Sequence, residues 1–246
     1  MQVLLANKGN NMPLKSKNWL KAKIHSIIEL TEQTWKFSIK FDKDFIFVPG
    51  QFITIRLRGI TRSYSIASFS KNKDIIELII VRVENGKLTS ILFRDVKVGE
   101  RLEVKGPIGN FILPKDINRD IFFICTGTGL APFKSILDEV VISGNFPKRI
   151  FLIFGTRKKS DLLFYDELIS LSKINSNFKY IPVLSRENWD GKTGYVHDQY
   201  YKIVKEEKLQ NPLFYLCGWR NMIVDAKAKL NSLGVKPDNI KLELFG

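Results

Sequence analysis

Hydrophobic and polar positions alternate along the first part of the chain, between about residue 20 and residue 106. A period of two, in segments rich in β-branched and aromatic residues, is typical of half-buried strands. The turn signals Pro49-Gly50 and Asn85-Gly86 separate such segments. Six strands are expected, at residues 21–30, 34–41, 51–59, 62–69, 74–83 and 100–107. With one helix over residues 87–96, they predict a small six-stranded antiparallel β-barrel.

The pattern changes from about residue 117, where short apolar runs begin to alternate with helical periodicity. Pro132 fits the first turn of the first helix, and Ser160 fits the N-cap of the second. Buried strands are expected at 120–127, 149–155, 178–185, 212–218 and 239–245, and helices at 131–143, 160–173, 194–207 and 220–234. This alternation predicts a doubly wound parallel sheet.

The segment "GPIGNFILPKD", residues 106–116, is rich in proline and glycine and separates the two patterns. We therefore expect a β-barrel domain over 18–114 and an α/β domain over 115–246, after a flexible leader over 1–17 in which Met12 is an alternative start. The leader lacks the pattern of a signal peptide, and the chain contains no apolar run of membrane-spanning length. A cytoplasmic protein without membrane insertion is expected.

Charge and cysteine content narrow the classes of partner and cofactor. The 246 residues carry a formal net charge of +14, which favours an acidic partner or nucleic acid. The lysines are spread along the chain and no nucleic-acid motif accompanies them, so no nucleic acid is expected. Cys125 and Cys217 are too few to hold an iron–sulfur cluster, and His25 and His197 lack zinc-ligand spacing, so no metal is expected.

The segment "CTGTGLAPF", residues 125–133, follows an apolar strand and opens a helix. Gly127 and Gly129 would let the backbone approach a pyrophosphate, and the helix N-terminus would attract its charge. Pro132 replaces the third glycine of the usual dinucleotide-binding pattern. The segment alone therefore leaves an ordinary turn as the alternative.

The second and third strands of the α/β part end in "GTRKKS", residues 155–160, and "LSREN", residues 184–188. The acid that commonly holds a ribose hydroxyl is missing there. Ser185 and Arg186 instead supply the hydroxyl and guanidinium that suit a 2′-phosphate. For the neighbouring lysines, a solvated basic edge remains the alternative.

The segment "TRSYSIAS", residues 61–68, carries a guanidinium, a phenol and several hydroxyl groups on one predicted strand. Arg62 and Tyr64 share one side, while Ser63 and Ser65 share the other unless the strand bends. A guanidinium suits a diphosphate, a flat aromatic ring suits an isoalloxazine, and a hydroxyl suits the flavin N5. An ordinary strand with a polar edge is the alternative.

Four segments occur in the order and spacing of the ferredoxin–NADP reductase superfamily, and the chain resembles that family over about residues 18–246. They are "RSYSIAS" at 62–68, "ENGKLTSILF" at 84–93, "GTGLAPF" at 127–133 and "CGWRNM" at 217–222. Within the family, the chain is most similar to bacterial single-chain reductases and to the reductase modules of oxygenases.

The resemblance implies a bound FAD and assigns residues to it. Arg62 is expected to contact the FAD diphosphate, Tyr64 to stack on the flavin, and Ser65 to lie at the flavin N5 beside Ser63. The other implied FAD contacts, along the ribityl chain and at the diphosphate, are Ile80, Val81, Gly86, Leu88, Thr89 and Ser90.

The resemblance also implies an NADP site. Thr128, between Gly127 and Gly129, is expected to face both the flavin and the nicotinamide. Residues implied at the adenosine end and the 2′-phosphate are Thr156, Arg157, Ser185 and Arg186. Residues implied near the nicotinamide are Cys217, Gly218, Trp219, Arg220 and Met222, with Glu243 and Phe245 approaching the flavin face. Ser65, Cys217 and Glu243 would shape the hydride-transfer contact.

The resulting hypothesis is a monomeric flavoenzyme that passes electrons between NADPH and an acidic ferredoxin or flavodoxin through FAD, with NADH as the alternative donor. A second hypothesis is the NAD(P)H-dependent reductase component of an oxygenase, or a free-flavin reductase. A third is a non-catalytic FAD-binding electron-transfer subunit. The resembled subunit of that third kind carries a C-terminal cysteine cluster that this sequence lacks.

Overall fold

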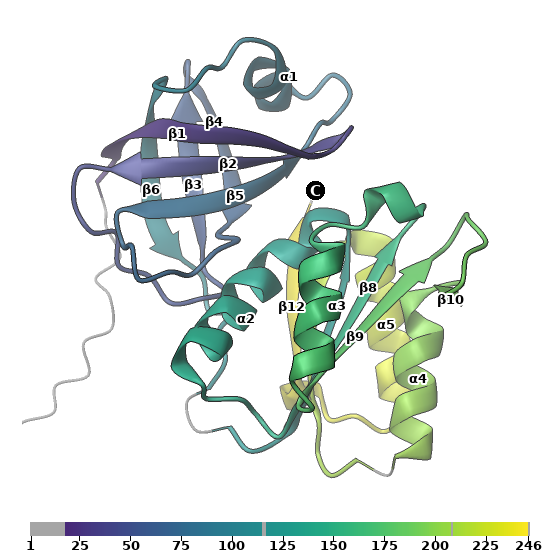
Figure 1. Cartoon of the computed structure of the whole chain (residues 1–246). Helices are drawn as coiled ribbons and strands as arrows, with labels where there is room; N and C mark the ends of the chain where they lie inside the picture. Colours follow the sequence, from purple (N-terminus) through teal and green to yellow (C-terminus); the bar gives the residue numbers. More distant parts are fainter. Residues whose placement is uncertain (1–17, 115–116, 208, 246) are drawn as a thin grey trace, which may run out of the picture.

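The computed structural model describes residues 18–114, 117–207 and 209–245, which form two sheets with helices (Figure 1). The expected leader over 1–17 lies outside the described residues. The first sheet contains β1 (Leu20–Thr31), β2 (Thr34–Phe41), β3 (Phe52–Leu57), β4 (Ile60–Ser65), β5 (Ile75–Val81) and β6 (Arg101–Ile108), with helix α1 (Lys87–Arg94) following β5.

The first sheet has the strand order β4-β3-β6-β1-β2-β5, and its neighbouring strands are antiparallel. An isolated bridge between Ile66 and Leu78 brings the end of β4 to β5 and closes the barrel. In β3 the buried positions alternate, so Ile53, Ile55 and Leu57 point into the barrel core. The prediction of a six-stranded antiparallel N-terminal sheet is confirmed.

The second sheet contains β7 (Asp120–Thr126), β8 (Arg149–Thr156), β9 (Phe178–Leu184), β10 (Lys192–Thr193), β11 (Leu213–Trp219) and β12 (Ile240–Phe245). Its order is β10-β9-β8-β7-β11-β12, and every pairing is parallel. The doubly wound parallel sheet is therefore confirmed. The two-residue strand β10 is an addition that the hydrophobic pattern did not predict.

Helices α2 (Ala131–Ser143) and α3 (Tyr165–Ile174) cover one face of the second sheet, and α4 (Val196–Glu206) and α5 (Arg220–Ser232) cover the other (Figure 1). Alternate residues of β7 point into the two apolar cores, one on each face of the sheet: Phe123 packs on the α2 side and Phe122 on the α4–α5 side. Three short 3-10 turns complete the described chain: η1 (Gly127–Leu130), η2 (Lys159–Asp161) and η3 (Pro237–Asn239).

The predicted start of the second helix at Ser160 is wrong. Ser160 lies in η2, and α3 begins only at Tyr165. Leu162 and Leu163 turn into the core, and Phe164 adopts a left-handed conformation with φ of 53°, which interrupts any helix begun at 160. Pro132, by contrast, stands in the first turn of α2 as predicted.

The two domains share a packed apolar interface. Ala67, Ile79 and Phe111, from the barrel side, belong to the same core cluster as Phe133 and Tyr215 of the α/β domain. The Tyr215 hydroxyl also donates to the carbonyl oxygen of Ile112 at 2.9 Å. This interface fixes the barrel against α2 and β11, where the candidate site lies.

Both cysteines lie inside the second sheet. Cys125 on β7 and Cys217 on β11 are register partners, and neither side chain is exposed. Burial raises the pKa of both thiols well above their ordinary value. Separately, none of the helices within the described residues is both long enough and apolar enough to cross a membrane.

Candidate functional site

A cleft of about 620 Å³ opens between the barrel and the carboxyl ends of β7 and β11. This is the edge of a parallel sheet where strand order reverses, the usual ligand-binding position of doubly wound folds. The cleft is lined by Phe52, Arg62, Ser63, Tyr64, Ser65, Ile79, Ile80, Val81, Val83, Gly86, Lys87, Leu88, Thr89, Thr126, Thr128, Ala131, Gly218, Trp219, Glu243 and Leu244.

Strand β4 supplies the barrel side of the cleft. Arg62 is exposed, Tyr64 is half-buried and Ser65 is buried, so exposure falls along the strand towards the domain interface. Burial, opposed by the charge of Arg62, raises the pKa of Tyr64 to about 12. The phenol is therefore neutral at physiological pH, and its ring packs in part against the apolar core of the barrel.

The N-terminus of α1 forms one end of the cleft. Gly86 precedes the helix in an extended conformation, and no side chain caps it. A Cβ at Gly86 would lie 2.3 Å from the Oγ1 atom of Thr89, which itself holds the turn by donating to the carbonyl oxygen of Val83 at 3.2 Å. Uncapped backbone amides at a helix N-terminus, with Arg62 and Lys87 in the same lining, make a site suited to a diphosphate.

The turn after β7 approaches β11 so closely that only glycine fits. A Cβ at Gly129 would lie 2.3 Å from the carbonyl oxygen of Cys217, and Gly127 has a φ of 54°. Thr126, just before this turn, lines the cleft, and its buried Oγ1 atom has no hydrogen-bond partner among the described residues. A buried hydroxyl without a partner is costly, so a ligand group in the cleft is its natural acceptor or donor.

Ser65 and Glu243 join the two sides of the cleft. The Ser65 hydroxyl donates to the Glu243 carboxylate at 2.6 Å, although the two residues are 178 positions apart. Burial raises the pKa of the Glu243 carboxyl, and the hydrogen bond from Ser65 opposes this rise. Cys217 lies beneath them: its burial is complete and it is not part of the lining.

A second polar cluster lies at the carboxyl ends of β8 and β9. The Ser185 amide donates to the carbonyl oxygen of Thr156 at 3.0 Å, and the Arg186 amide donates to that of Arg157 at 3.0 Å. These bonds hold the serine hydroxyl and the two exposed arginines on neighbouring backbones. Glu187 accepts a hydrogen bond from the Lys159 amide at 3.0 Å, so one acid also lies in this cluster.

The structure brings most of the predicted residues together. Those that line the cleft are Arg62, Ser63, Tyr64, Ser65, Ile80, Val81, Gly86, Leu88, Thr89, Thr128, Gly218, Trp219 and Glu243. Those outside the lining are Ser90, Gly127, Gly129, Cys217, Arg220, Met222 and the cluster at Thr156, Arg157, Ser185 and Arg186. The Phe245 backbone pairs with that of Trp219, but its side chain is not described.

Sequence reasoning missed several lining residues. These are Phe52, Ile79, Val83, Lys87, Thr126, Ala131 and Leu244. Lys87, the first helical residue after "NG", and Thr126, the last residue before "GTG", stand directly beside motifs that were recognised. For Lys87 and Thr126, the signal available in the sequence was their position beside motifs whose backbone amides were expected to bind phosphate groups. The others are apolar residues of strands, helix starts and turns, whose orientation depends on the folded barrel.

The residues present fit FAD. The cleft has the volume and apolar lining that an isoalloxazine needs, with Tyr64 as the flat partner and an anion site at Arg62 and the α1 N-terminus. The unpartnered Thr126 hydroxyl lies at the opposite wall. The fit rests on the shape and chemistry of this lining.

Comparisons with known proteins agree with this geometry. Residues 21–112 match the family "Oxidoreductase FAD-binding domain", and residues 123–228 match "Oxidoreductase NAD-binding domain". A solved ferredoxin NADP+ reductase from Neisseria gonorrhoeae, with bound FAD and NADP, superposes with a TM-score of 0.79 at 26% identity, covering 92% of this chain and 98% of that chain. The chain belongs to the ferredoxin–NADP reductase superfamily.

Two curated relatives are longer than this chain. The reductase component DmpP of phenol 2-monooxygenase from Pseudomonas sp. (strain CF600) is 31% identical over 206 residues, which is 81% of this chain and 58% of that protein. The CDP-6-deoxy-L-threo-D-glycero-4-hexulose-3-dehydrase reductase of Yersinia pestis is 33% identical over 202 residues, 81% of this chain and 60% of that protein. The chain therefore spans about three fifths of the length of these two reductases.

Proposed function

We propose that this protein is an FAD-dependent oxidoreductase that passes electrons from NADPH to a ferredoxin or flavodoxin. The observation that carries the proposal is the shared cleft. Arg62, Tyr64 and Ser65 of the FAD-binding side face Thr128 and Glu243 of the nucleotide-binding side across one cavity. Two ligands held by the two domains would meet there.

The chemistry that FAD supplies when bound is to take up two electrons from a reduced nicotinamide and to release them one at a time. The chain's own residues bind and orient. Tyr64 offers its ring as a stacking surface, while Arg62 and the α1 N-terminus hold the diphosphate. Buried Ser65 donates its hydroxyl proton to the half-buried Glu243 carboxylate at 2.6 Å, and this bond orients both side chains beside the reacting centre.

The nucleotide side of the proposal rests on the close approach of η1 to β11. Because Gly129 lacks a side chain, the turn carrying Thr128 lies against the backbone of Cys217 and Gly218. Thr128 and Gly218 both line the cleft at this contact, where a nicotinamide would lie. The exposed Arg157, Ser185 and Arg186 lie at the carboxyl ends of β8 and β9, where a 2′-phosphate would bind, which favours NADPH over NADH.

The proposed partner is an acidic one-electron carrier. The chain has a net charge of +14, and the exposed side chains of Arg62 and Lys87 lie in the lining of the cleft. A positive rim of this kind steers an acidic protein towards the flavin edge and makes its association salt-dependent.

A second candidate function is favoured by one observation. Among the relatives is the phenol 2-monooxygenase reductase component, which is named for service to an oxygenase. In that case the same cleft would deliver electrons to an oxygenase or to its ferredoxin. The two functions differ only in the acceptor.

The decisive experiment is an absorbance spectrum of the purified protein, followed by anaerobic addition of NADPH or NADH. A flavin band that NADPH bleaches faster than NADH is the expected result. A protein that takes up no FAD, or whose flavin responds to neither nucleotide, would refute the proposal. Steady-state assays with a ferredoxin, a flavodoxin and an oxygenase component as alternative acceptors then separate the two candidate functions.

A further inference from the structure

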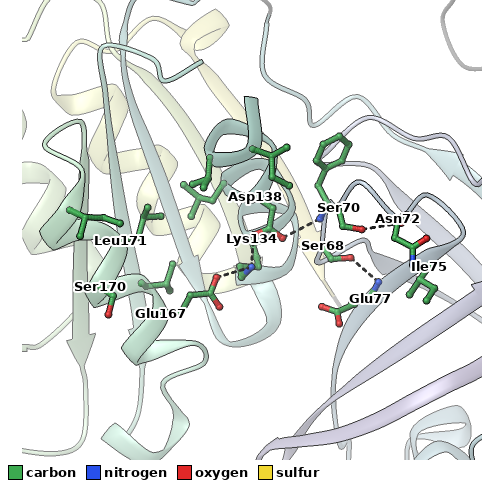
Figure 2. Close-up of a pocket in the computed structure, with 16 residues that line it drawn as sticks. Ser68, Ser70, Asn72, Ile75, Glu77, Lys134, Asp138, Glu167, Ser170 and Leu171 are labelled. Atoms are coloured by element: carbon green, nitrogen blue, oxygen red, sulfur yellow. Dashed lines mark hydrogen bonds and ion pairs between the residues drawn. The ribbon is translucent and has the colours of Figure 1, made fainter. Parts of the chain in front are cut away.

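Behind the cleft, a second hollow of about 570 Å³ separates the barrel from helices α2 and α3 (Figure 2). Its walls are the loop that follows β4 and the outer faces of the two helices. Figure 2 shows Asp138 of α2 directed towards the loop that carries Ser68 and Ser70, with Lys134 lying between Asp138 and Glu167 of α3. The polar contacts on its floor cross from one domain to the other.

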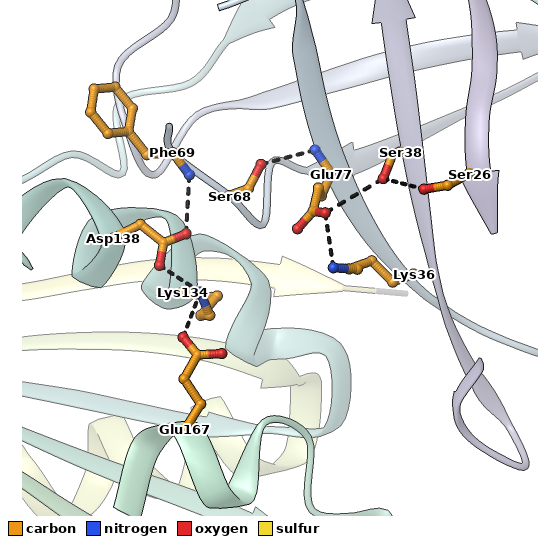
Figure 3. A network of polar contacts seen from close by, with 9 residues as sticks. All are labelled: Ser26, Lys36, Ser38, Ser68, Phe69, Glu77, Lys134, Asp138 and Glu167. Atoms are coloured by element: carbon orange, nitrogen blue, oxygen red, sulfur yellow. Dashed lines mark hydrogen bonds and ion pairs between the residues drawn. The ribbon is translucent and has the colours of Figure 1, made fainter. Parts of the chain in front are cut away.

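Two hydrogen bonds make the crossing, and we call them the interdomain latch. The Phe69 amide donates to the Oδ2 atom of Asp138 at 3.1 Å. The Ser135 hydroxyl donates to the carbonyl oxygen of Ser68 at 3.0 Å. Ser135 is fully buried, and Asp138 also accepts from Lys134, which lies 3.0 Å from Glu167 (Figure 3).

The loop held by the latch is a fixed part of the barrel. The Ala67 amide donates to the carbonyl oxygen of Glu77 at 2.8 Å, and the Glu77 amide donates to the Ser68 hydroxyl at 3.0 Å. Glu77 is itself paired with Lys36 on β2 at 2.8 Å (Figure 3). Residues 67–69 therefore cannot shift without disturbing β5 and β2.

Each side of the latch continues directly into the cleft. Phe69 lies four residues after Ser65, the buried cleft residue at the end of β4. Asp138 and Ser135 lie on α2, the helix that begins immediately after the Thr128 turn. A displacement at the latch is therefore carried by rigid elements to the two walls of the cleft.

We propose that Asp138 and Ser135 are positioning residues that set the spacing between the flavin-binding wall and the nicotinamide-binding wall of the cleft. This inference rests on the proposed function and adds to it two residues that touch neither ligand. The Asp138–Phe69 bond is the dominant contact, because it joins a carboxylate to a backbone amide that has no other hydrogen bond described. The ion pair from Lys134 orients that carboxylate.

Hydride transfer is sensitive to such spacing, since misplacement of reacting groups by 1 Å can cost about a hundredfold in rate. Asp138→Ala is expected to lower the rate constant of flavin reduction at saturating NADPH by about tenfold, which is less than the hundredfold loss for a misplacement of 1 Å. FAD content and the dissociation constant for NADPH should stay within about twofold, because each ligand keeps its own wall.

Two matched variants isolate the amide bond. Asp138→Asn keeps an oxygen acceptor for the Phe69 amide while removing the charge. Glu167→Gln weakens an ion pair of the same lysine that joins α3 to α2 and not to the barrel. Both should reduce the flavin at rates within about twofold of the wild type. Equal slowing in Asp138→Ala and Glu167→Gln, or no slowing in Asp138→Ala, would overturn the proposal.

Hydrogen exchange of the Phe69 amide, measured on the protein without nucleotide, gives a readout independent of catalysis. Exchange should be faster in Asp138→Ala only, and unchanged exchange would contradict the latch. If wild-type flavin responds to no nucleotide, the proposed function fails while this measurement still decides the latch. If Asp138→Ala does not fold, Ser135→Ala takes its place in the experiment. Flavin reduction in Ser135→Ala should be about two- to threefold slower, with unchanged affinity for the nucleotide. An unchanged rate would overturn the positioning role.

Discussion

Replacing Arg186 by alanine should weaken the proposed preference for NADPH over NADH. Arg186 is exposed, but its backbone amide donates a hydrogen bond to the carbonyl oxygen of Arg157 at 3.0 Å. The backbone that carries the guanidinium is therefore held in place. A hydrogen bond to a charged group contributes about 1.5–3 kcal/mol, and solvent exposure places this one at the lower end. A loss of about 1.5 kcal/mol is about tenfold in affinity.

The assay is steady-state reduction of an artificial acceptor with NADPH and with NADH. In Arg186→Ala the kcat/KM for NADPH should fall about tenfold, while that for NADH should change less than about twofold, because NADH lacks the 2′-phosphate. Arg101→Ala is the matched control: it removes the same charge from β6 of the barrel, at a residue outside the cleft lining.

Ionic strength must be held constant, since both nucleotides are anions attracted by the whole positive surface. Equal losses for NADPH and NADH in Arg186→Ala would show that the arginine acts only through general attraction. No loss for either nucleotide would remove Arg186 from the binding site altogether.

Two further predictions concern the cleft itself. Tyr64→Ala should lower the FAD content of the purified protein, whereas Tyr64→Phe should retain it, because stacking uses the ring and not the hydroxyl; full flavin absorbance in the alanine variant would refute the stacking role. Ser65→Ala should destabilise the fold more at pH 8 than at about pH 4, which lies below the ordinary pKa of a glutamate carboxyl. Folding raises the pKa of the Glu243 carboxyl, so the folded protein binds this proton more tightly than the unfolded chain does. The free energy of unfolding therefore falls as the pH rises from the carboxyl's pKa in the unfolded chain to its pKa in the folded protein. The Ser65 bond stabilises the ionised form and limits that loss, so its removal should cost about 1–2 kcal/mol at the higher pH, or about 2–8 °C in Tm, and an equal deficit at both pH values would contradict the reasoning.

Local patterns predicted the two sheets and the glycine turn beside the cleft because these depend on short-range signals, whereas most other cleft residues were implied by the resemblance to the ferredoxin–NADP reductase superfamily. The alternation in β3 and the apolar run of β7 each report burial along one strand. Glycine positions such as Gly129 report a close backbone approach that no other residue allows. These signals are readable without knowing what lies opposite.

Other features depend on contacts that the local pattern does not contain. The Asp138–Phe69 bond spans 69 positions, and nothing in "FKSILDEV" distinguishes Asp138 from a solvated helical acid. Likewise, the late start of α3 depends on Leu162 and Leu163 finding space in the core, which overrides the helical periodicity of residues 160–173. Tertiary packing, not propensity, decided both.

The two free thiols on neighbouring central strands provide an internal reporter of local unfolding. Cys125 and Cys217 are register partners with no exposed surface, so a thiol-reactive reagent reaches them only when the β7–β11 ladder separates. When closing is faster than modification, the labelling rate therefore measures the free energy of that opening. The protein thus carries, without any engineered label, a probe of how far its nucleotide-binding sheet opens in solution and of how much a bound nucleotide suppresses that opening.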